Sequence, residues 1–396
     1  MKGYESMTQQ QSPILIKNGT IYSENSILKN VSLLLKEGEI ARIVSDDDIN
    51  VDDLTVIDAT DLHVIPGFID GHIHGARGYD VMDASEEALD AIAHYLPQEG
   101  VTSFLATTIT QSFENIEKAL VNVAKFPNKP YQAELIGIHL EGPFINEKMA
   151  GAQPKKYIIQ PNKELFKKWQ KLANHQIKTI TIAPELDIDG EFIHYLVEEG
   201  INVSAGHTDA SFDEMKEAVQ HGVRQLTHLC NAMKGIHHRD IGAVGAAFQL
   251  RPLRSELIAD GVHVSKEMLQ IIYNNIGSDR IILITDAIRA KALGSGNYEL
   301  GGQPVKVLVD KAILHDGTLA GSILKMQDAA FQMFNLDGVT IQDIVKMTST
   351  NIAKQLGIDD RKGVIAEGKD ADLVVMDSKL TIKYTICRGQ ISYKGN

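Results

Sequence analysis

The sequence predicts an α/β fold, a (β/α)8 TIM-like barrel that carries a small β-sandwich domain formed by both chain termini. Between residues 66 and 363, eight short β-branched runs alternate with helical stretches, which is typical of βα units in a parallel sheet. Both ends of the chain show strand and turn patterns instead, and the termini of a domain often lie close together. We therefore predict a β-sandwich from residues 13–65 plus 364–396 and a barrel from residues 66–363.

The terminal segments contain the signals of short strands and tight turns. Residues 14–65 hold apolar runs that are interrupted by Asn-Gly at Asn18 and by Glu-Gly at Glu37. The tail, residues 362–395, repeats this pattern of apolar runs and turns. These segments therefore predict β-strands at both ends of the chain.

The barrel strands are predicted from the apolar runs in the central part of the chain. They are residues 67–74, 101–110, 134–142, 178–185, 201–208, 225–232, 255–263 and 281–288. Ser85 and Ser211 are suited to begin helices, and Gly100 and Gly222 to follow their ends. Evidence for a helix between the sixth and seventh strands is thin. A Gly-rich segment, residues 294–309, follows the eighth strand.

The composition indicates a globular acidic protein. Lys and Arg number 39 against 52 Asp and Glu, so the formal net charge is −13, and 43% of the residues are hydrophobic. An acidic chain repels nucleic acid and anionic membranes, so neither is expected as a partner. Bulk charge alone also disfavours an anionic substrate, although a few local donors are enough to bind one.

The cysteines and the amino-terminal residues predict a cytoplasmic location. Cys230 and Cys387 are too few for a disulfide framework, which fits a reducing compartment. Residues 1–13 show no apolar core of a secretory signal, and no apolar run is long enough to span a bilayer.

Polar residues at the ends of the predicted strands form a metal-ligand set. In barrel enzymes the chemistry lies at the carboxyl ends of the strands. Those positions carry His72, His74, Glu141, His207, His228, His263 and Asp286. Imidazole and carboxylate are ligands that zinc or ferrous iron accepts. His72 and His74 are two residues apart in a strand, so both imidazoles point to the same side. We therefore expect a divalent metal, one or two per chain.

Other polar residues are interpreted more plainly. His139 is expected to be a buried or supporting histidine rather than a ligand. Arg239 follows the sixth strand and offers the fork that binds phosphate. Cys230 is not assigned as a nucleophile, because no partnering base is evident.

Several stretches resemble the amidohydrolase superfamily over essentially the whole chain. They are PGFIDGHIH, GIHLEGPF followed by GAQP, SAGHTDA, THLCNAM, HHRD, IADGVH, ITDAIRA, DGTLAGS and the tail KGVIAEGKDADLVV. Within that superfamily they are most similar to the deacetylases of amino-sugar phosphates. The resemblance implies metal-dependent hydrolysis of the acetamide of N-acetylglucosamine 6-phosphate, in amino-sugar catabolism or cell-wall recycling.

The resemblance also implies roles for individual residues. Glu141, His207 and His228 match the principal metal ligands, and His72 with His74 matches a pair that holds a second metal in some members. Asp286 matches the catalytic acid and base, which would take a proton from water and return it to the leaving amine. Positions that match substrate contacts are Ala152, Asn231, Ala232, Arg239, His263, Leu319, Ala320, Gly321 and Ser322. A homodimer is implied, with Arg239 reaching the partner's site.

Two departures and three alternatives accompany this resemblance. Some members carry Gln-x-Asn where this chain has His72 and His74, and some carry His where it has Gln153, which leaves open how Gln153 orients the substrate. The galactosamine epimer is an alternative substrate. Another amide hydrolase with a carboxylated lysine at the fourth strand is less well supported, because Lys178 begins that strand. A non-catalytic scaffold would have lost ligands, and all the expected ones are present.

Overall fold

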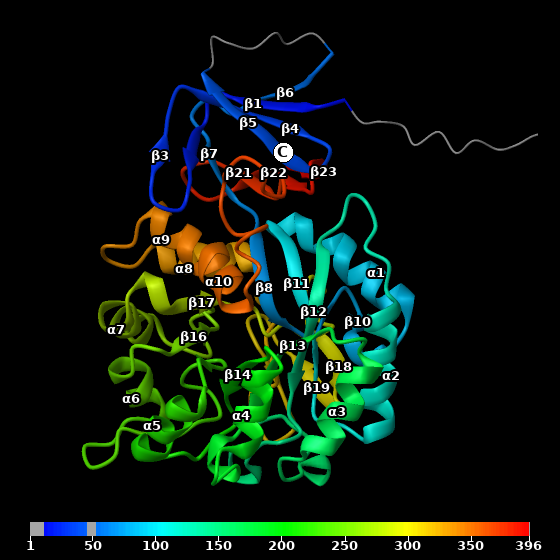
Figure 1. The fold of residues 1–396 in the computed structure, drawn as a ribbon, viewed down its shortest axis with the longest axis vertical. Coiled ribbons are helices and arrows are strands. Elements are labelled where there is room, and N and C mark those ends of the chain that lie inside the picture. The colour runs from blue at the N-terminus through cyan, green and yellow to red at the C-terminus, as the bar shows by residue number, and fades with distance from the viewer. Residues whose placement is uncertain (1–11, 46–52, 396) are drawn as a thin grey trace, which may run out of the picture.

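The centre of the molecule is an eight-stranded parallel sheet. The computed structural model describes residues 12–45 and 53–395. Neighbours in the sheet are also consecutive along the chain, as expected for repeated βα units (Figure 1). The strands are β8 (Phe68–Ile73), β11 (Val101–Thr108), β12 (Glu134–Glu141), β13 (Ile177–Ile182), β14 (Asn202–Ala205), β15 (Gln225–Leu226), β16 (Arg254–Leu257) and β17 (Ile281–Leu283).

The first and last strands close this sheet into a barrel. A parallel bridge joins Ile73 to Ala287, just beyond β17. The Asp286 amide donates to the His72 carbonyl at 2.8 Å, and the His74 amide donates to the Ala287 carbonyl at 2.9 Å. The predicted (β/α)8 barrel is therefore confirmed, and its closing seam runs through three of the predicted site residues.

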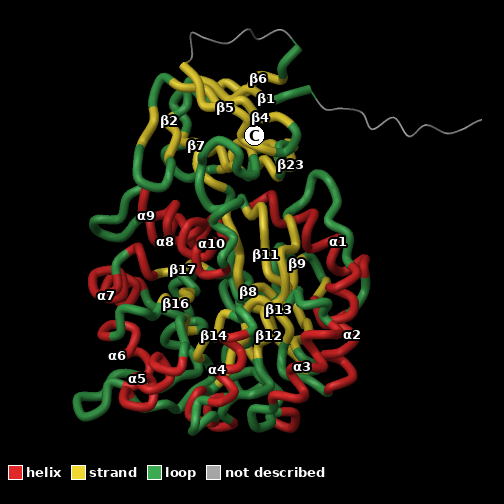
Figure 2. The backbone as a smooth tube through the Cα atoms, in the orientation of Figure 1, coloured by secondary structure: helices red, strands yellow, loops and turns green. Residues whose placement is uncertain are grey.

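Helices cover the outside of the barrel (Figure 2). They are α1 (Glu86–Tyr95), α2 (Phe113–Lys125), α3 (Lys163–Leu172), α4 (Glu191–Glu198), α5 (Phe212–His221), α6 (Gly242–Gln249), α7 (Lys266–Ile276), α8 (Met326–Phe334), α9 (Ile341–Val345) and α10 (Asn351–Leu356). Ser85 and Ser211 begin α1 and α5 as predicted, each accepting a backbone hydrogen bond. Gly222 follows α5, whereas Gly100 ends a short turn that extends α1.

Helix α6 lies between the sixth and seventh strands, where evidence for a helix in the sequence is thin. Its sequence, GAVGAAFQ, contains two glycines, which lower helix propensity, and residues 242–247 are all buried, so no helical period of apolar and polar residues shows. A side chain at Gly245 would lie 2.3 Å from the Ile241 side chain. Tertiary packing, with Ala243, Ala246 and Ala247 fully buried, stabilises this helix.

The Gly-rich segment after β17 forms a small antiparallel sheet. Its strands are β18 (Gly296–Leu300), β19 (Gln303–Val307) and β20 (Ala312–Ile313). Leu300, Val305 and Val307 pack with Ile109 and Ile288 from the barrel mouth in one apolar cluster. This sheet therefore lies against the open end of the barrel.

Both chain ends build the β-sandwich. One sheet has the order β5-β4-β1-β6 and the other β23-β22-β21-β7-β2-β3. Strands from the amino-terminal side are β1 (Ile14–Lys17), β2 (Thr20–Tyr22), β3 (Ile27–Leu28), β4 (Val31–Lys36), β5 (Glu39–Ser45), β6 (Thr55–Asp58) and β7 (His63–Pro66). Those from the tail are β21 (Leu373–Met376), β22 (Ile382–Cys387) and β23 (Gln390–Lys394).

The two chain ends meet where β7 pairs antiparallel with β21. Side chains from both sheets, including Ile16, Leu33, Val64 and Leu373, share one buried apolar cluster. The predicted terminal sandwich is confirmed, and the domain boundaries at residues 65 and 364 stay a prediction. Residues 1–11, in which no signal peptide is predicted, lie outside the described part. Among the described helices, none combines the length and apolar character that a membrane span needs.

Candidate active site and metal centre

The predicted ligands gather at one end of the barrel, on strand ends and on the loops that follow. His72 lies in β8, His74 directly follows it, and Glu141 is the last residue of β12. The strands that precede His207, His228 and Asp286 are shorter than the sequence predicted, so these three residues lie on loops. Their φ angles are 49°, 34° and 47°, in the left-handed region that non-glycine residues rarely adopt. Such strain is typical of functional sites, where the surrounding structure holds the backbone in place.

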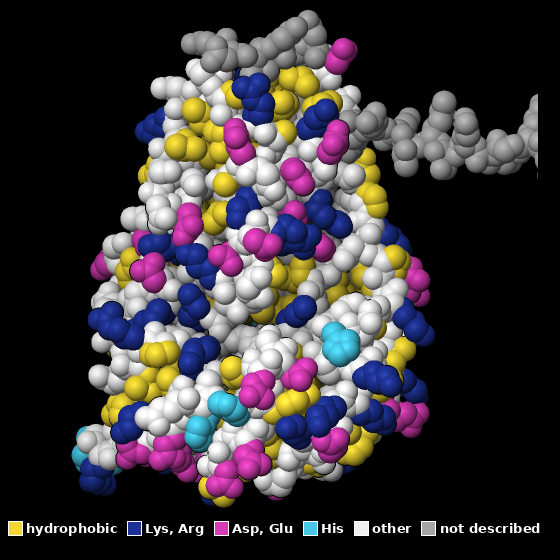
Figure 3. Space-filling view, in the orientation of Figure 1, with side chains coloured by type: hydrophobic (Ala, Val, Ile, Leu, Met, Phe, Trp, Pro, Cys, Tyr) yellow, Lys and Arg dark blue, Asp and Glu magenta, His cyan; other side chains and the backbone are white. Residues whose placement is uncertain are grey.

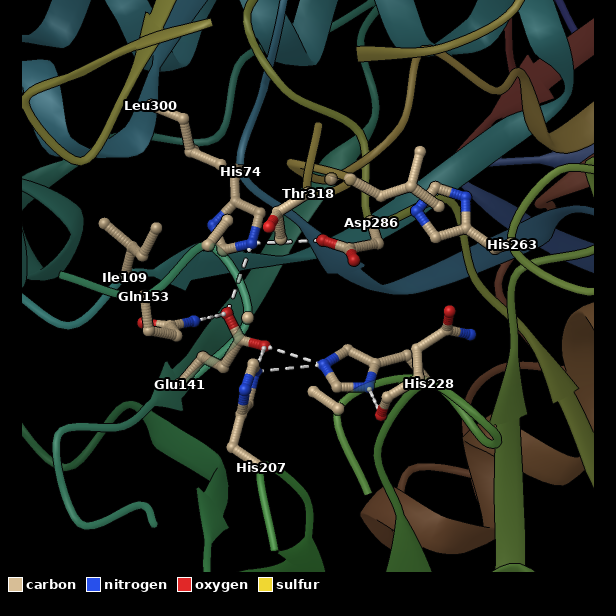
Figure 4. Close-up of a pocket in the computed structure, with 16 residues that line it drawn as sticks. His74, Ile109, Glu141, Gln153, His207, His228, His263, Asp286, Leu300 and Thr318 are labelled. Atoms are coloured by element: carbon tan, nitrogen blue, oxygen red, sulfur yellow. Dashed lines mark hydrogen bonds and ion pairs between the residues drawn. The ribbon is translucent and has the colours of Figure 1, made fainter. Parts of the chain in front are cut away.

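The first donor group consists of Glu141, His207 and His228 (Figure 4). Glu141 Oε1 lies 3.2 Å from both His207 Nε2 and His228 Nε2, and the two Nε2 atoms are 3.1 Å apart. Ligands of a tetrahedral zinc ion at about 2.0–2.1 Å lie about 3.3 Å from one another. The spacing of the three donor atoms therefore matches a metal site.

The tautomers of the two histidines support the same conclusion. His207 Nδ1 donates to the Met149 carbonyl at 2.9 Å, and His228 Nδ1 donates to the Asn231 carbonyl at 3.2 Å. Because a neutral imidazole then carries its proton on Nδ1, both Nε2 atoms present lone pairs. Two lone pairs and a carboxylate oxygen that converge in a buried space repel one another unless a cation lies between them. The residues present therefore fit a divalent metal.

The second donor group shares Glu141 with the first. His72, His74 and Glu141 place ligand atoms close together, and all three side chains are buried. His74 Nε2 lies 3.3 Å from Glu141 Oε2 and 3.2 Å from Asp286 Oδ1, and His72 Nε2 lies 3.4 Å from the same Asp286 oxygen. Glu141 is thus placed to bridge two cations, and Asp286 stands beside the second.

Electrostatics in this cluster are dominated by burial and by opposite charges at close range. Burial lowers the pKa of His74, but the Asp286 and Glu141 carboxylates outweigh it and raise that pKa to about 10. Burial raises the pKa of Asp286, but the neighbouring His72 and His74 outweigh it, and the pKa falls below its usual value. The two carboxylates therefore favour positive charge between them, which a bound cation also supplies.

Gln153 orients Glu141, a role that the sequence left open. Its Nε2 donates to Glu141 Oε2 at 2.7 Å, and its Oε1 accepts from the Thr110 amide at 2.8 Å. The Thr110 backbone thus fixes which end of the amide faces the carboxylate. Gln153 also lines the cavity described next, so it lies where a substrate would meet the metal site.

A cavity of about 250 Å³ opens onto both donor groups. His74, Glu141, His207, His228 and Asp286 form its polar floor. Of the predicted substrate contacts, those that line it are Ala152, Asn231, Ala232, His263, Leu319 and Gly321. Ile109, Leu300 and Thr318 also line it, and they were not predicted as contacts because they are apolar or small residues on loops and in β18.

Three predicted substrate contacts do not line this cavity. Arg239 is exposed on a loop, where its guanidinium meets His238 Nε2 at 2.8 Å. Ala320 and Ser322 are buried. The Ser322 amide donates to the Asp286 carbonyl at 2.8 Å, so Ser322 supports the segment that carries Asp286. Their direct roles in substrate binding stay predictions.

His139 lies behind the ligands, as expected. Its Nε2 bonds to Thr181 Oγ1 at 2.7 Å, and its ring packs edge-on against the His72 ring at a centroid distance of 4.5 Å. His139 therefore supports His72 rather than facing the cavity.

Comparisons with known proteins show the family of this chain. Residues 63–392 match the model of the amidohydrolase family. The chain is 46% identical to N-acetylglucosamine-6-phosphate deacetylase from Bacillus subtilis (strain 168), over 96% of this chain and 97% of that protein. It is 33% identical to N-acetylgalactosamine-6-phosphate deacetylase from Escherichia coli O157:H7, over 83% of this chain and 87% of that protein.

Solved structures show the same architecture. N-acetylglucosamine-6-phosphate deacetylase from Thermotoga maritima matches with a TM-score of 0.87 and 33% identity, over 96% of this chain and 100% of that one. A mutant of the Mycobacterium smegmatis enzyme in complex with N-acetyl-D-glucosamine 6-phosphate matches with a TM-score of 0.89 and 26% identity, over 97% and 100%. The chain belongs to the amidohydrolase family. Its similarity within that family is to deacetylases of amino-sugar phosphates.

Proposed function

We propose that this chain hydrolyses the acetamide of N-acetyl-D-glucosamine 6-phosphate to D-glucosamine 6-phosphate and acetate, using one or two divalent metal ions, zinc or iron. The observation that carries the proposal is the convergence of Glu141, His207 and His228 beside Asp286 on the floor of one cavity. The 46% identity to a deacetylase of this substrate supports the choice of amide.

Asp286 is the residue proposed to move protons in this reaction. A divalent cation held by the donor groups supplies Lewis acidity, which activates water and polarises the acetamide carbonyl. Asp286 accepts the proton as the water oxygen bonds to the carbonyl carbon. It then returns that proton to the nitrogen as the carbon–nitrogen bond breaks, which releases acetate and the free amine.

The phosphate is proposed to bind near His263 and Asn231, which line the same cavity as the metal ligands. His263 Nδ1 donates to Asp260 Oδ2 at 2.6 Å, and Asp260 Oδ1 is itself held by the Val262 and His263 amides. This arrangement fixes the ring, so that Nε2 is the atom available to the cavity.

Arg239 is proposed to complete the phosphate site of a partner subunit in a homodimer. Within one chain it lies on an exposed loop that also carries Ile236, a large apolar residue that is 52% exposed. An exposed arginine and an exposed apolar side chain on one loop are typical of an interface.

The few cysteines and the reducing compartment that they suggest support a cytoplasmic location.

A substrate panel tests the proposal. Acetate release is measured on N-acetylglucosamine 6-phosphate, on its galactosamine and mannosamine epimers, and on unphosphorylated N-acetylglucosamine, with metal content determined on the same sample. We expect the glucosamine phosphate to have the highest kcat/KM and the unphosphorylated sugar to lose mainly in KM. Preference for the galactosamine epimer would reassign the substrate, and no acetate release from any of the four would refute the proposal.

A further inference from the structure

Glu256 is a buried carboxylate that the proposed reaction does not use. It lies in β16 with an exposed fraction of 1%, and it is not among the residues that line the cavity. Its Oε2 lies 3.0 Å from His72 Nδ1 and accepts from the His228 backbone amide at 3.3 Å. One oxygen therefore contacts a ligand residue from each donor group. Its other oxygen, Oε1, accepts from Gln225 Nε2 at 2.6 Å.

A chain of side-chain amides leads away from Glu256 through Gln225, Asn202 and Gln355, and we call these three residues the amide relay. Asn202 Nδ2 donates to Gln225 Oε1 at 2.9 Å, and Gln355 Nε2 donates to Asn202 Oδ1 at 2.6 Å. At the far end, the Arg254 guanidinium donates to Gln355 Oε1 at 2.6 Å. The relay thus connects a cation in β16 to the carboxylate two residues further along the same strand.

The two ends of the relay fix the direction of every hydrogen bond in it. A guanidinium can only donate, so Gln355 must turn its oxygen toward Arg254 and its NH₂ group toward Asn202. The same constraint passes to Asn202 and then to Gln225, whose NH₂ group must face Glu256. Glu256 ends the relay as an acceptor through Oε1, and a carboxylate, unlike an amide, can accept from His72 through its second oxygen as well.

The acceptor role of Glu256 affects the metal site through His72. Because Glu256 Oε2 accepts, His72 carries a proton on Nδ1, and a neutral ring then has its lone pair on Nε2. That atom lies 3.5 Å from Glu141 Oε1 and 3.4 Å from Asp286 Oδ1, and it is buried without a hydrogen-bond partner among the described residues. The lone pair therefore points to the space shared by the second donor group.

We propose that Glu256 and the amide relay are positioning residues that hold His72 in the tautomer able to bind the second metal ion. This rests on the proposed metal-dependent function. Through the His228 amide, the same carboxylate also steadies a loop of the first donor group. Glu256, His72 and His139 themselves form a possible ligand cluster, but both Glu256 oxygens already accept hydrogen bonds, so the carboxylate acts through His72.

The variant Glu256→Gln tests the proposal with almost no change in side-chain size. The single oxygen of the new amide cannot accept from both Gln225 and His72. Its NH₂ group therefore faces one of these two donors, unless His72 moves its proton to Nε2 and so loses the lone pair on that atom. Loss of such a supporting partner lowers metal affinity by about 10- to 100-fold. We expect this loss at the weaker of two metal sites, measured by competition with a chromophoric chelator on the intact protein.

The double variant Glu256→Gln/Gln225→Glu is the matched rescue. The carboxylate at position 225 accepts from Asn202 and from the new amide at position 256, whose oxygen can again accept from His72. We expect the weaker metal site to return to within about threefold of the wild-type affinity. The single variant Gln225→Glu places two carboxylates together, and its metal affinity completes the double-mutant cycle.

Metal affinity separates this proposal from the proposed function, because it is measured without substrate. The positioning role would be overturned if Glu256→Gln bound two metal ions with wild-type affinities, or if the double variant bound them no better than the single one. Binding of only one metal ion by the wild-type chain would also overturn it. Acetate release by the wild-type chain judges the proposed function independently of these results.

Discussion

Asp286 is held in place by its backbone, which leaves its carboxylate available at the cavity. Its amide donates to the His72 carbonyl and its carbonyl accepts from the Ser322 amide, both at 2.8 Å. The left-handed φ of 47° turns the chain sharply at this residue. The carboxylate therefore faces His74 and the cavity from a fixed position, as a group that transfers protons requires.

Replacing Asp286 with Asn tests its role as acid and base. The amide has nearly the same size and can still offer an oxygen to a metal, but it does not accept a proton. We expect turnover to fall by about 100-fold or more, with metal content near that of the wild type, because Glu141, His207 and His228 are unchanged. Steady-state acetate release and elemental analysis check this. Near-normal turnover would remove Asp286 from the proton-transfer step.

Single residues differed in how far the sequence could predict them. His72, His74, Glu141 and the histidines beyond them were predicted because ligand-type residues followed successive apolar runs. The relay residues could not be, because Asn and Gln in strands and helices have no spacing that marks a shared network. Glu256 is one acid among many in the sequence, and only its burial and its contacts distinguish it.

At the scale of elements, the strand ends determine where the chemistry lies. Strands β14, β15 and β17 are only two to four residues long, because the chain leaves the sheet before it reaches His207, His228 and Asp286. Apolar runs predict where a strand begins better than where it ends, since buried loops at the barrel mouth are also apolar. The eight strands were thus predicted correctly, and the carboxyl ends of β8 and β12 to within one residue, whereas those of β13 to β17 were placed at least three residues too late.

The turn before β11 carries a prediction about pH. Burial raises the pKa of Glu99, at the end of this turn, from 4.5 to about 7, although it forms an ion pair with the buried Lys291. Because the folded pKa is the higher one, this carboxyl contributes stability that is present below pH 4.5 and lost as the pH rises to about 7. The difference between the two pKa values corresponds to about 3 kcal/mol in the free energy of unfolding.

Thermal unfolding measured between pH 5 and 8 checks this prediction. We expect Glu99→Gln to show a smaller fall in Tm across that range than the wild type. The absolute Tm of the variant can be lower, because Lys291 loses its partner. An identical dependence on pH in the two proteins would contradict the role given to Glu99.

Two features belong to the whole molecule: the pairing of its two chain ends and its net charge. Pairing of β7 with β21 joins segments about 300 residues apart, which strand patterns at both ends predicted. Acidic and basic side chains are interspersed on the face seen in Figure 3, so its described residues show no continuous basic surface. The charge of −13 is therefore compatible with the proposed binding of phosphate by local groups such as His263, since salt screens charges beyond about 8 Å.

The proposed amide hydrolysis depends on a metal held by Glu141, His207 and His228. The most direct measurement is acetate release from N-acetylglucosamine 6-phosphate by chelator-stripped protein, titrated with zinc or ferrous ion beside the variant Glu141→Gln. We predict that stripping abolishes release, that one or two equivalents restore it in the wild type, and that the variant recovers less than about 1% of the rate. Full acetate release by the stripped protein, or full recovery by the variant, would show that hydrolysis does not depend on a metal held by Glu141.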